Sequence, residues 1–151
     1  MHLEDNISIR AARRADFDSL MPMMKALGTL DGEACQFTKK DFLKSGFGKA
    51  KSYSMLVALY KGTHVGYISF HPGYDMQSAS KGHYIIDLFV EKSHRQKRIG
   101  KRLMSEVARI STRAGGKWLS WHVRRSNAGA IAFYKRLGAH STNSLQFVLD
   151  L

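Results

Sequence analysis

The 151-residue chain has little cysteine and little proline: Cys35 is its only cysteine, and Pro22 and Pro72 are its only prolines. One cysteine cannot form an internal disulfide, which argues against a disulfide-stabilised secreted scaffold. No group of His, Cys, Asp and Glu residues shows the spacing of metal ligands, so we expect no metal site.

Long apolar runs are also missing. The longest ones, such as residues 55–60, are far too short to span a bilayer, and the first ten residues, MHLEDNISIR, lack the apolar stretch of a signal peptide. The composition, with 44% hydrophobic and 24% charged residues, is that of an ordinary globular protein. We therefore expect a cytoplasmic protein with one domain, residues 1–151, and no association with membranes.

Acidic residues are scarce as well. The 12 Asp and Glu residues face 24 Lys and Arg residues, which gives a formal net charge of +12. Such a charge predicts attraction to a polyanion, namely nucleic acid, an acidic membrane surface or a phosphate-rich cofactor, or it is a solvated surface. The glycine fingerprint of dinucleotide-binding folds and the Walker pattern are both absent, which argues against nicotinamide cofactors and P-loop chemistry.

Hydrophobic periodicity predicts strands alternating with helices, separated by short turns. The predicted strands are residues 7–10, 54–60, 65–70, 84–90, 118–123 and 145–149. The predicted helices are residues 15–28, 38–43, 99–110 and 127–137, with glycines ending three of them. Residues 73–82 are expected to form a loop. This order predicts an α/β (α+β) fold, a mixed sheet with helices packed on its faces.

A basic segment, SHRQKRIGKRL, occupies residues 93–103, between the predicted strand 84–90 and the helix that follows it. A turn at this place directs backbone N–H groups outward at the positive end of a helix dipole. Gly100 lets a ligand approach the backbone closely. The segment could be a solvated helix start, but its position favours a site for a compact anion such as a pyrophosphate.

Two segments of the chain resemble a known family. Residues 90–103 are similar to the Arg/Gln-x-x-Gly-x-Gly/Ala signature of the GNAT superfamily of acetyl-CoA-dependent N-acetyltransferases. Arg95 and Gly100 match its outer positions, and Arg98 stands where the first glycine is usual. Residues 127–139 resemble the late Asn…Phe-Tyr segment of the same family. Asn127 and Tyr134 are seven residues apart, about two turns along one helical face.

Within the superfamily, the closest likeness is to the spermidine/spermine (diamine) acetyltransferase group. Residues 9–12, 38–48, 87–90 and 133–136 carry it. That group often has an acidic pair before the apolar strand residues, whereas this chain has Ile86 followed by Asp87.

The resemblance implies a single GNAT-like domain, with a mixed and mostly antiparallel sheet flanked by helices on both faces. It also implies acetyl-CoA as the donor, and a homodimer. Asn127 would contact the cofactor arm and Tyr134 would protonate the departing thiolate, although Tyr134 could equally be a core aromatic residue. The residues expected to contact the cofactor are Leu88, Phe89, Val90, Arg95, Gln96, Lys97, Arg98, Ile99, Gly100, Lys101, Arg102, Asn127 and Tyr134.

The acceptor side of the expected site depends on Asp87. A carboxylate in an apolar strand is costly to bury unless it is paired, so it faces a cleft or meets a cation. It could anchor a substrate ammonium, act as general base in place of a water chain, or form a structural ion pair. The resemblance also places substrate contacts in two loops, at Asp31, Glu33, Tyr74 and Asp75.

Three functions are compatible with these features. The first is N-acetylation of a small polyamine-, diamine- or amino-acid-like amine. The second is acetylation of a protein or peptide amine. The third, from another class, is a basic nucleic-acid-binding module, for which the chain lacks a recognised reading motif or a basic stripe with interleaved aromatic residues. The first is the prediction taken forward.

Overall fold

The computed structural model describes residues 6–151, and these form two compact units. The first unit ends at Trp121 and holds the β-sheet. The second unit, His122–Leu151, contains helix α4 (Ala128–Arg136). The single domain expected for residues 1–151 remains a prediction.

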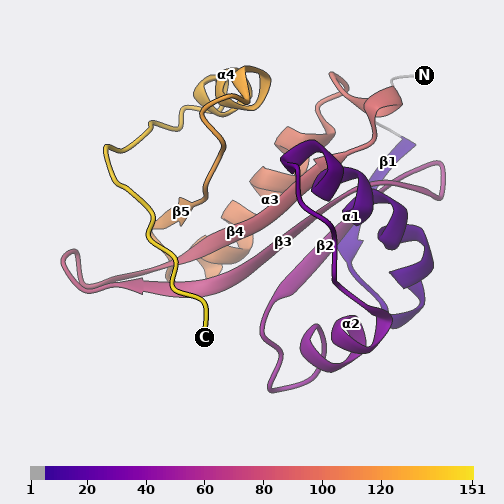
Figure 1. The fold of residues 1–151 in the computed structure, drawn as a ribbon, viewed down its shortest axis with the longest axis horizontal. Helices are drawn as coiled ribbons and strands as arrows, with labels where there is room; N and C mark the ends of the chain where they lie inside the picture. The colour runs from indigo at the N-terminus through magenta and orange to yellow at the C-terminus, as the bar shows by residue number, and fades with distance from the viewer. Residues whose placement is uncertain (1–5) are drawn as a thin grey trace. The chain divides into compact units, whose positions relative to one another are not determined.

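The first unit is built on a five-stranded sheet with the strand order β1-β2-β3-β4-β5 (Figure 1). The strands are β1 (Ile7–Ala11), β2 (Ser54–Tyr60), β3 (Thr63–Asp75), β4 (Ser80–Val90) and β5 (Trp118–Ser120). All neighbouring strands are antiparallel except β4 and β5, which are parallel. The predicted mixed and mostly antiparallel sheet is therefore confirmed.

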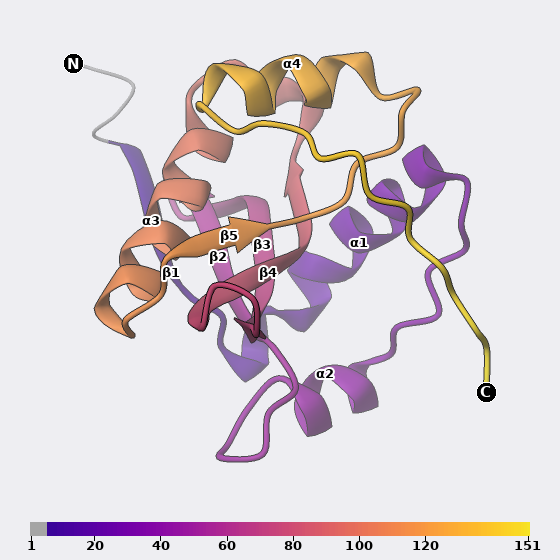
Figure 2. The same ribbon diagram turned by 90° about the vertical axis from the view of Figure 1, so that its left-hand side faces the viewer.

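Helices cover both faces of this sheet. They are α1 (Phe17–Asp31), α2 (Lys39–Ser45) and α3 (Ile99–Arg113), with short 3₁₀ helices η2 (Arg14–Asp16) and η3 (Lys92–His94). Figure 2 shows α1 and α2 on one side of the strands and α3 on the other. Within residues 6–151, no helix combines the length and the apolar character needed to cross a membrane.

Alternation along the strands explains the two layers. In β2, Met55, Val57 and Leu59 belong to the core cluster formed with α1 and α2. Helix α3 buries Leu103 and Val107 on its sheet-facing side, as the helical spacing of its apolar residues predicted.

A buried carboxylate fixes the start of α1. Asp16 is 4% exposed and accepts hydrogen bonds from both terminal nitrogens of Arg10, at 2.7 and 2.9 Å, and from the backbone N–H of Arg13 at 2.6 Å. The Nε2 atom of His64 lies 2.9 Å from the Oδ1 atom of Asp16. These contacts connect β1, the entry to α1 and the start of β3, and the partners compensate for burying the charge.

The predicted end of the first helix, at Gly28, was wrong. Helix α1 continues to Asp31, and Gly32 ends it in the left-handed conformation, with φ of 73°. Gly28 instead lets the backbone of Glu33 approach the helix closely, because a Cβ atom at Gly28 would lie 2.7 Å from the carbonyl oxygen of Glu33.

The predicted loop at residues 73–82 was also wrong, because β3 and β4 extend through most of it and pair from Asp75 and Ser80 onward. Gly73 and Gly82 face each other in this hairpin, and glycine disfavours strands in a sequence-based prediction. Here the glycines leave room for the rings of Tyr84 and Trp118, which a Cβ atom at either position would meet.

The last two predicted strands differ from the structure. The strand predicted at residues 118–123 is shorter, since β5 ends at Ser120. The strand predicted at residues 145–149 is not formed, and its Leu145 and Phe147 are exposed. Apolar alternation alone does not make a strand, because the backbone also needs a neighbouring strand to pair with.

Candidate active site

The basic segment forms an irregular turn between β4 and α3. Gln96 and Arg98 have left-handed backbones, with φ of 60° and 63°, and α3 begins directly after Arg98. The first N–H groups of a helix have no intrahelical acceptor, and the first turn of α3 contains no acidic residue. This turn can therefore hold an anion with backbone donors.

Arg98 has a backbone conformation that glycine adopts without strain. A left-handed conformation costs a non-glycine residue roughly 1–2 kcal/mol, which explains why the family signature usually has a glycine here. The backbone of the turn thus keeps a glycine-like geometry while Arg98 adds a positive charge.

Two side chains of the turn lie back against the sheet. The Nε of Arg95 donates to the carbonyl of Val90 at 2.9 Å, and its guanidinium lies 5.7 Å from the centre of the Phe89 ring. The Nζ of Lys97 lies 5.7 Å from the centre of the Tyr60 ring. Both cations are held beside the turn, where they add positive potential to its backbone donors.

Strands β4 and β5 part after Tyr84, well before β4 reaches this turn. Strand β5 pairs only with Gly82–Tyr84, so within the first unit the same edge of β4 has no strand partner from Ile85 to Val90. The register between β3 and β4 shifts at this point, leaving Ile86 as an extra residue, a β-bulge of the kind common beside active sites. The backbones of Leu88, Phe89 and Val90 lie along the unpaired edge.

A pocket of about 250 Å³ opens on the α1 face of the sheet. Three acidic residues from separate parts of the chain line it: Asp31 at the end of α1, Glu33 just beyond it, and Asp87 in β4. We call these three residues and the cavity between them the acidic pocket. Its other lining residues are Met24, Leu27, Gly28, Ala34, Cys35, Phe37, Tyr53, Met55, Ser69 and Ile86.

The surroundings of Asp87 perturb its carboxyl group. Burial raises the pKa of Asp87, and the charge of Asp31 raises it further, while a long hydrogen bond from the Tyr67 hydroxyl, at 3.5 Å, opposes the shift. Burial also raises the pKa of Tyr67, so this hydroxyl remains a donor. Within the described chain, the groups that shift this pKa are a hydroxyl and a second carboxylate rather than a cation. A raised pKa suits a proton acceptor better than a structural ion pair.

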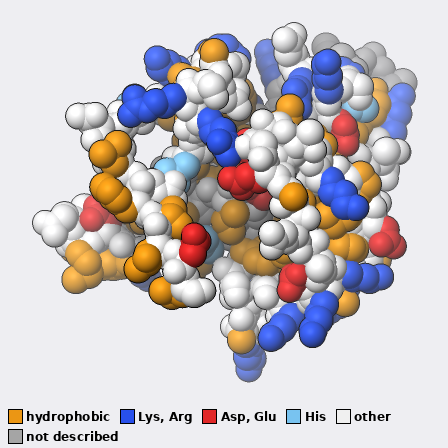
Figure 3. Space-filling model, in the orientation of Figure 1, with side chains coloured by type: hydrophobic (Ala, Val, Ile, Leu, Met, Phe, Trp, Pro, Cys, Tyr) orange, Lys and Arg blue, Asp and Glu red, His pale blue; other side chains and the backbone are white. Residues whose placement is uncertain are grey.

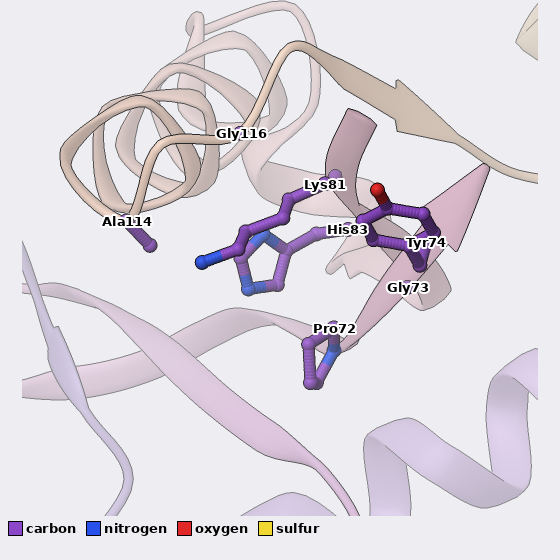
Figure 4. Close-up of a pocket in the computed structure, with 8 residues that line it drawn as sticks. Pro72, Gly73, Tyr74, Lys81, His83, Ala114 and Gly116 are labelled. Carbon is purple, nitrogen blue, oxygen red and sulfur yellow. The ribbon is translucent and has the colours of Figure 1, made fainter. Parts of the chain in front are cut away.

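Tyr74 and Asp75 do not line the acidic pocket. Tyr74 borders a different cavity, of about 560 Å³, on the α3 face of the β3–β4 hairpin; Figure 4 shows it with Lys81 and His83. The carboxylate of Asp75 accepts hydrogen bonds from the Gln77 backbone and the Ser78 hydroxyl, which lowers its pKa and stabilises the hairpin turn. The structure thus separates these two candidates from Asp31, Glu33 and Asp87.

Asn127 and Tyr134 belong to the second unit. Asn127 caps α4, and its side-chain oxygen accepts a hydrogen bond from the Ala130 N–H at 3.1 Å. Tyr134 lies on the same helix, with its ring 5.3 Å from that of Phe133. Their expected roles toward acetyl-CoA remain predictions.

Sequence reasoning missed the apolar and hydroxyl walls of the acidic pocket. Ser69 and Ile86 line it because of the register between β3 and β4 and the β-bulge at Ile86. No local sequence pattern predicts the register or the bulge. Phe37 and Tyr53 also line it, but an apolar side chain in the sequence predicts only a position in the hydrophobic core. Among residues 6–151, no cluster of three or more His, Cys, Asp or Glu residues could hold a metal ion.

Comparison with known proteins identifies the fold and the family. Residues 21–139 match the Acetyltransferase (GNAT) family. In structure, the chain resembles an aminoglycoside acetyltransferase from an uncultured soil metagenomic sample, solved with sisomicin, with a TM-score of 0.83 and 18% identity over 99% of both chains. At this identity the likeness shows the fold.

Two curated relatives are amine acetyltransferases. An L-ornithine N5-acetyltransferase from Arabidopsis thaliana is 36% identical over 74 residues, which are 49% of this chain and 32% of that enzyme. This chain therefore spans about a third of the length of that relative. A thialysine N-epsilon-acetyltransferase from Bos taurus is 26% identical over 145 residues, with 88% of this chain and 84% of the enzyme covered. The chain belongs to the acetyltransferase (GNAT) family.

Proposed function

We propose that this acyltransferase moves an acetyl group from acetyl-CoA to the primary amine of a small cationic molecule. The observation that carries the proposal is the acidic pocket, which is lined by three acidic residues although the chain as a whole has a net charge of +12. Such a pocket attracts an ammonium group and repels an anion.

A basic region of the surface strengthens this contrast. Lys and Arg side chains gather around α2, on the margin of the first unit (Figure 3). A cationic acceptor is repelled from this region and attracted to the acidic pocket. The electrostatic field of the protein therefore favours binding at the acidic pocket. The names of the two curated relatives specify side-chain amines of amino acids, which are cations of this kind. An acceptor of the diamine or polyamine type and a homodimer remain predictions from the resemblance, and the cytoplasmic location remains a prediction from the composition.

Asp87 is the proposed general base. An amine attacks only when it is neutral, so an ammonium held in the pocket must first lose a proton. Burial and the charge of Asp31 raise the proton affinity of the Asp87 carboxylate, which brings it closer to that of the amine. Asp87 first takes one proton from the ammonium. The neutral amine nitrogen then forms a bond to the acetyl carbon, the carbon–sulfur bond breaks, and the nitrogen releases a second proton, which balances the proton gained by the leaving thiolate.

The donor would lie along the turn and the unpaired edge of β4. When bound, acetyl-CoA supplies the acetyl group on a thioester. The turn from Arg95 to Arg102 would hold the pyrophosphate with backbone N–H groups and cations. Backbone N–H groups among Leu88, Phe89 and Val90 would stabilise the charge that grows on the thioester oxygen. As the resemblance implies, Tyr134 would give its proton to the leaving thiolate, and Asn127 would contact the cofactor arm.

Thiol release from acetyl-CoA over a panel of small amines tests this function. We expect turnover with ornithine-like amines, and a fall of kcat/KM by about 10²–10⁴-fold in Asp87→Asn. The control is Asp18→Asn, which makes the same change at an exposed position of α1 and should leave the rate unchanged. Absence of both thermal stabilisation by acetyl-CoA and turnover of any amine would refute the proposal.

A further inference from the structure

Three rings form a continuous aromatic surface beside the acidic pocket. Tyr84 in β4 lies between His71 in β3 and Trp118 in β5, with ring centres 5.3 Å and 4.9 Å apart, respectively. We call these three side chains the aromatic surface. Tyr84 is 37% exposed and Trp118 is partly exposed, so part of the surface is open to a ligand.

The aromatic surface and the acidic pocket lie on the same face of the sheet. In β3, Tyr67 belongs to the core cluster under α1 and Ser69 lines the acidic pocket, so His71, two residues further, points to that side as well. Phe70 and His83 point to the opposite side, where Nδ1 of His83 lies 2.8 Å from the hydroxyl of Ser111 in α3.

The backbone is shaped to hold these rings against the sheet. Gly73 and Gly82 are directly paired, and a Cβ atom at either position would collide with the Tyr84 or Trp118 ring. The indole N–H of Trp118 donates to the Ser80 hydroxyl at 3.1 Å, which orients the ring. The rings are therefore held in place on the sheet, with the His71 and Tyr84 planes tilted by 42° and the Tyr84 and Trp118 planes by 61°.

An apolar path joins the two features. Tyr84 and Asp87 are three residues apart in β4, which corresponds to about 10 Å along a strand. Between them, Ile86 is 50% exposed and also lines the acidic pocket. A molecule with its ammonium at Asp87 and an extended body along β4 would contact Ile86 and then the rings.

We propose that the acceptor is an amphipathic amine, with an ammonium for the acidic pocket and a flat apolar or aromatic group that packs against the rings of the aromatic surface. The proposal rests on the proposed function and assigns a substrate class to it. Its geometric requirement is a spacer that lets the flat group reach Tyr84 and Trp118 while the amine stays at Asp87.

A second positive charge fits this surface less well than a flat apolar group. The carboxylate of Asp75, further along β3, is already bonded to the hairpin turn, and Nδ1 of His71 is bonded to the carbonyl of Pro72. An ammonium on half-exposed rings keeps much of its hydration and gains little. A flat apolar group instead removes its own face and the ring faces from water, and it packs against them.

Acetylation of three matched series of amines tests the proposal: phenylalkylamines with one to six methylenes, n-alkylamines, and α,ω-diamines. We expect kcat/KM for phenylalkylamines to peak at an intermediate spacer and to exceed that of the matched alkylamines by about tenfold. Trp118→Ala and Tyr84→Leu should remove most of this advantage, lowering kcat/KM for the phenylalkylamines far more than that for propylamine, without changing the KM for acetyl-CoA.

The control variant is Met76→Ala, which truncates a side chain 79% exposed at the tip of the same hairpin and should keep the aromatic preference. Melting temperatures show whether each variant is folded. If Trp118→Ala is unstable, Tyr84→Leu still tests the proposal, because leucine keeps a large apolar side chain at that position. A preference for diamines, or an aromatic preference that survives both substitutions, would overturn the inference. Turnover of short alkylamines without aromatic preference would overturn only this inference, whereas no turnover of any amine would remove the proposed function.

Discussion

The substitution Asp16→Asn should destabilise the protein strongly, because it removes a buried charge at the entry to α1. Asp16 is 4% exposed and has two hydrogen bonds from Arg10, one from the Arg13 backbone, and His64 at 2.9 Å. Hydrogen bonds to charged groups contribute about 1.5–3 kcal/mol each, and breaking a buried pair costs about 3–5 kcal/mol. The Arg10 side chain is 26% exposed and regains some hydration, so we expect a net loss of about 2–4 kcal/mol.

Chemical denaturation of the wild type and the variant measures this loss. In thermal denaturation, a loss of this size in a chain of 151 residues should lower the melting temperature by roughly 5–15 °C. Asp18→Asn is the matched control, since it makes the same change at an exposed position two residues further along the chain, and it should stay within about 0.5 kcal/mol of the wild type. A loss of less than 0.5 kcal/mol in Asp16→Asn would refute the idea that this network fixes α1.

The same network predicts how stability depends on pH. Hydrogen bonds from Arg10 and the Arg13 N–H hold the pKa of Asp16 well below its usual range. A carboxyl group whose pKa is lower in the folded state stabilises the protein above its unfolded pKa of about 3.9, and this contribution is lost as the pH falls below that value. Asp16→Asn should therefore flatten the acid limb of the stability profile, and an unchanged limb would contradict the assignment.

Three further substitutions test the active site. Because the charge of Asp31 raises the pKa of Asp87, Asp31→Asn should move the acid limb of the kcat/KM profile to lower pH. An acid limb that stays in place would show that Asp87 is not the general base whose pKa sets this limb. Arg98→Gly should leave the melting temperature within a few degrees, since relief of left-handed strain offsets the entropy of glycine. It should also raise the KM for acetyl-CoA at low salt more than at high salt, whereas an unchanged KM would show that Arg98 binds no phosphate. Tyr134→Phe should lower kcat and leave the KM for acetyl-CoA unchanged, and an equal kcat would mean that Tyr134 serves only in packing.

Local chemistry made several elements predictable. The spacing of apolar residues predicted α3, and Thr38 with Asp41 forms the capping box that begins α2. The turn between β2 and β3 contains Lys61 and Gly62 with positive φ, as expected for a tight hairpin. In each case the decisive atoms lie within a few residues of one another.

Long-range pairing decided the elements that were predicted wrongly. Gly73 and Gly82 look like loop residues, yet their strands pair, and the rings of Tyr84 and Trp118 occupy the space that the missing side chains leave. Residues 145–149 alternate like a strand but pair with none in the described chain. Strand formation depends on a partner, and the local sequence does not specify that partner.

The sequence by itself determined the family resemblance and the basic turn, because a strand end, a left-handed turn and a helix start are consecutive in the chain. The tertiary structure decided the acceptor side. It brought Asp31, Glu33 and Asp87 into one pocket, separated Tyr74 and Asp75 from them, and placed an aromatic surface on the same face. These positions depend on how the end of α1 lies against β4 and on the register and bulge between β3 and β4, and backbone pairing and packing fix both, whereas the periodicity of the sequence specifies neither.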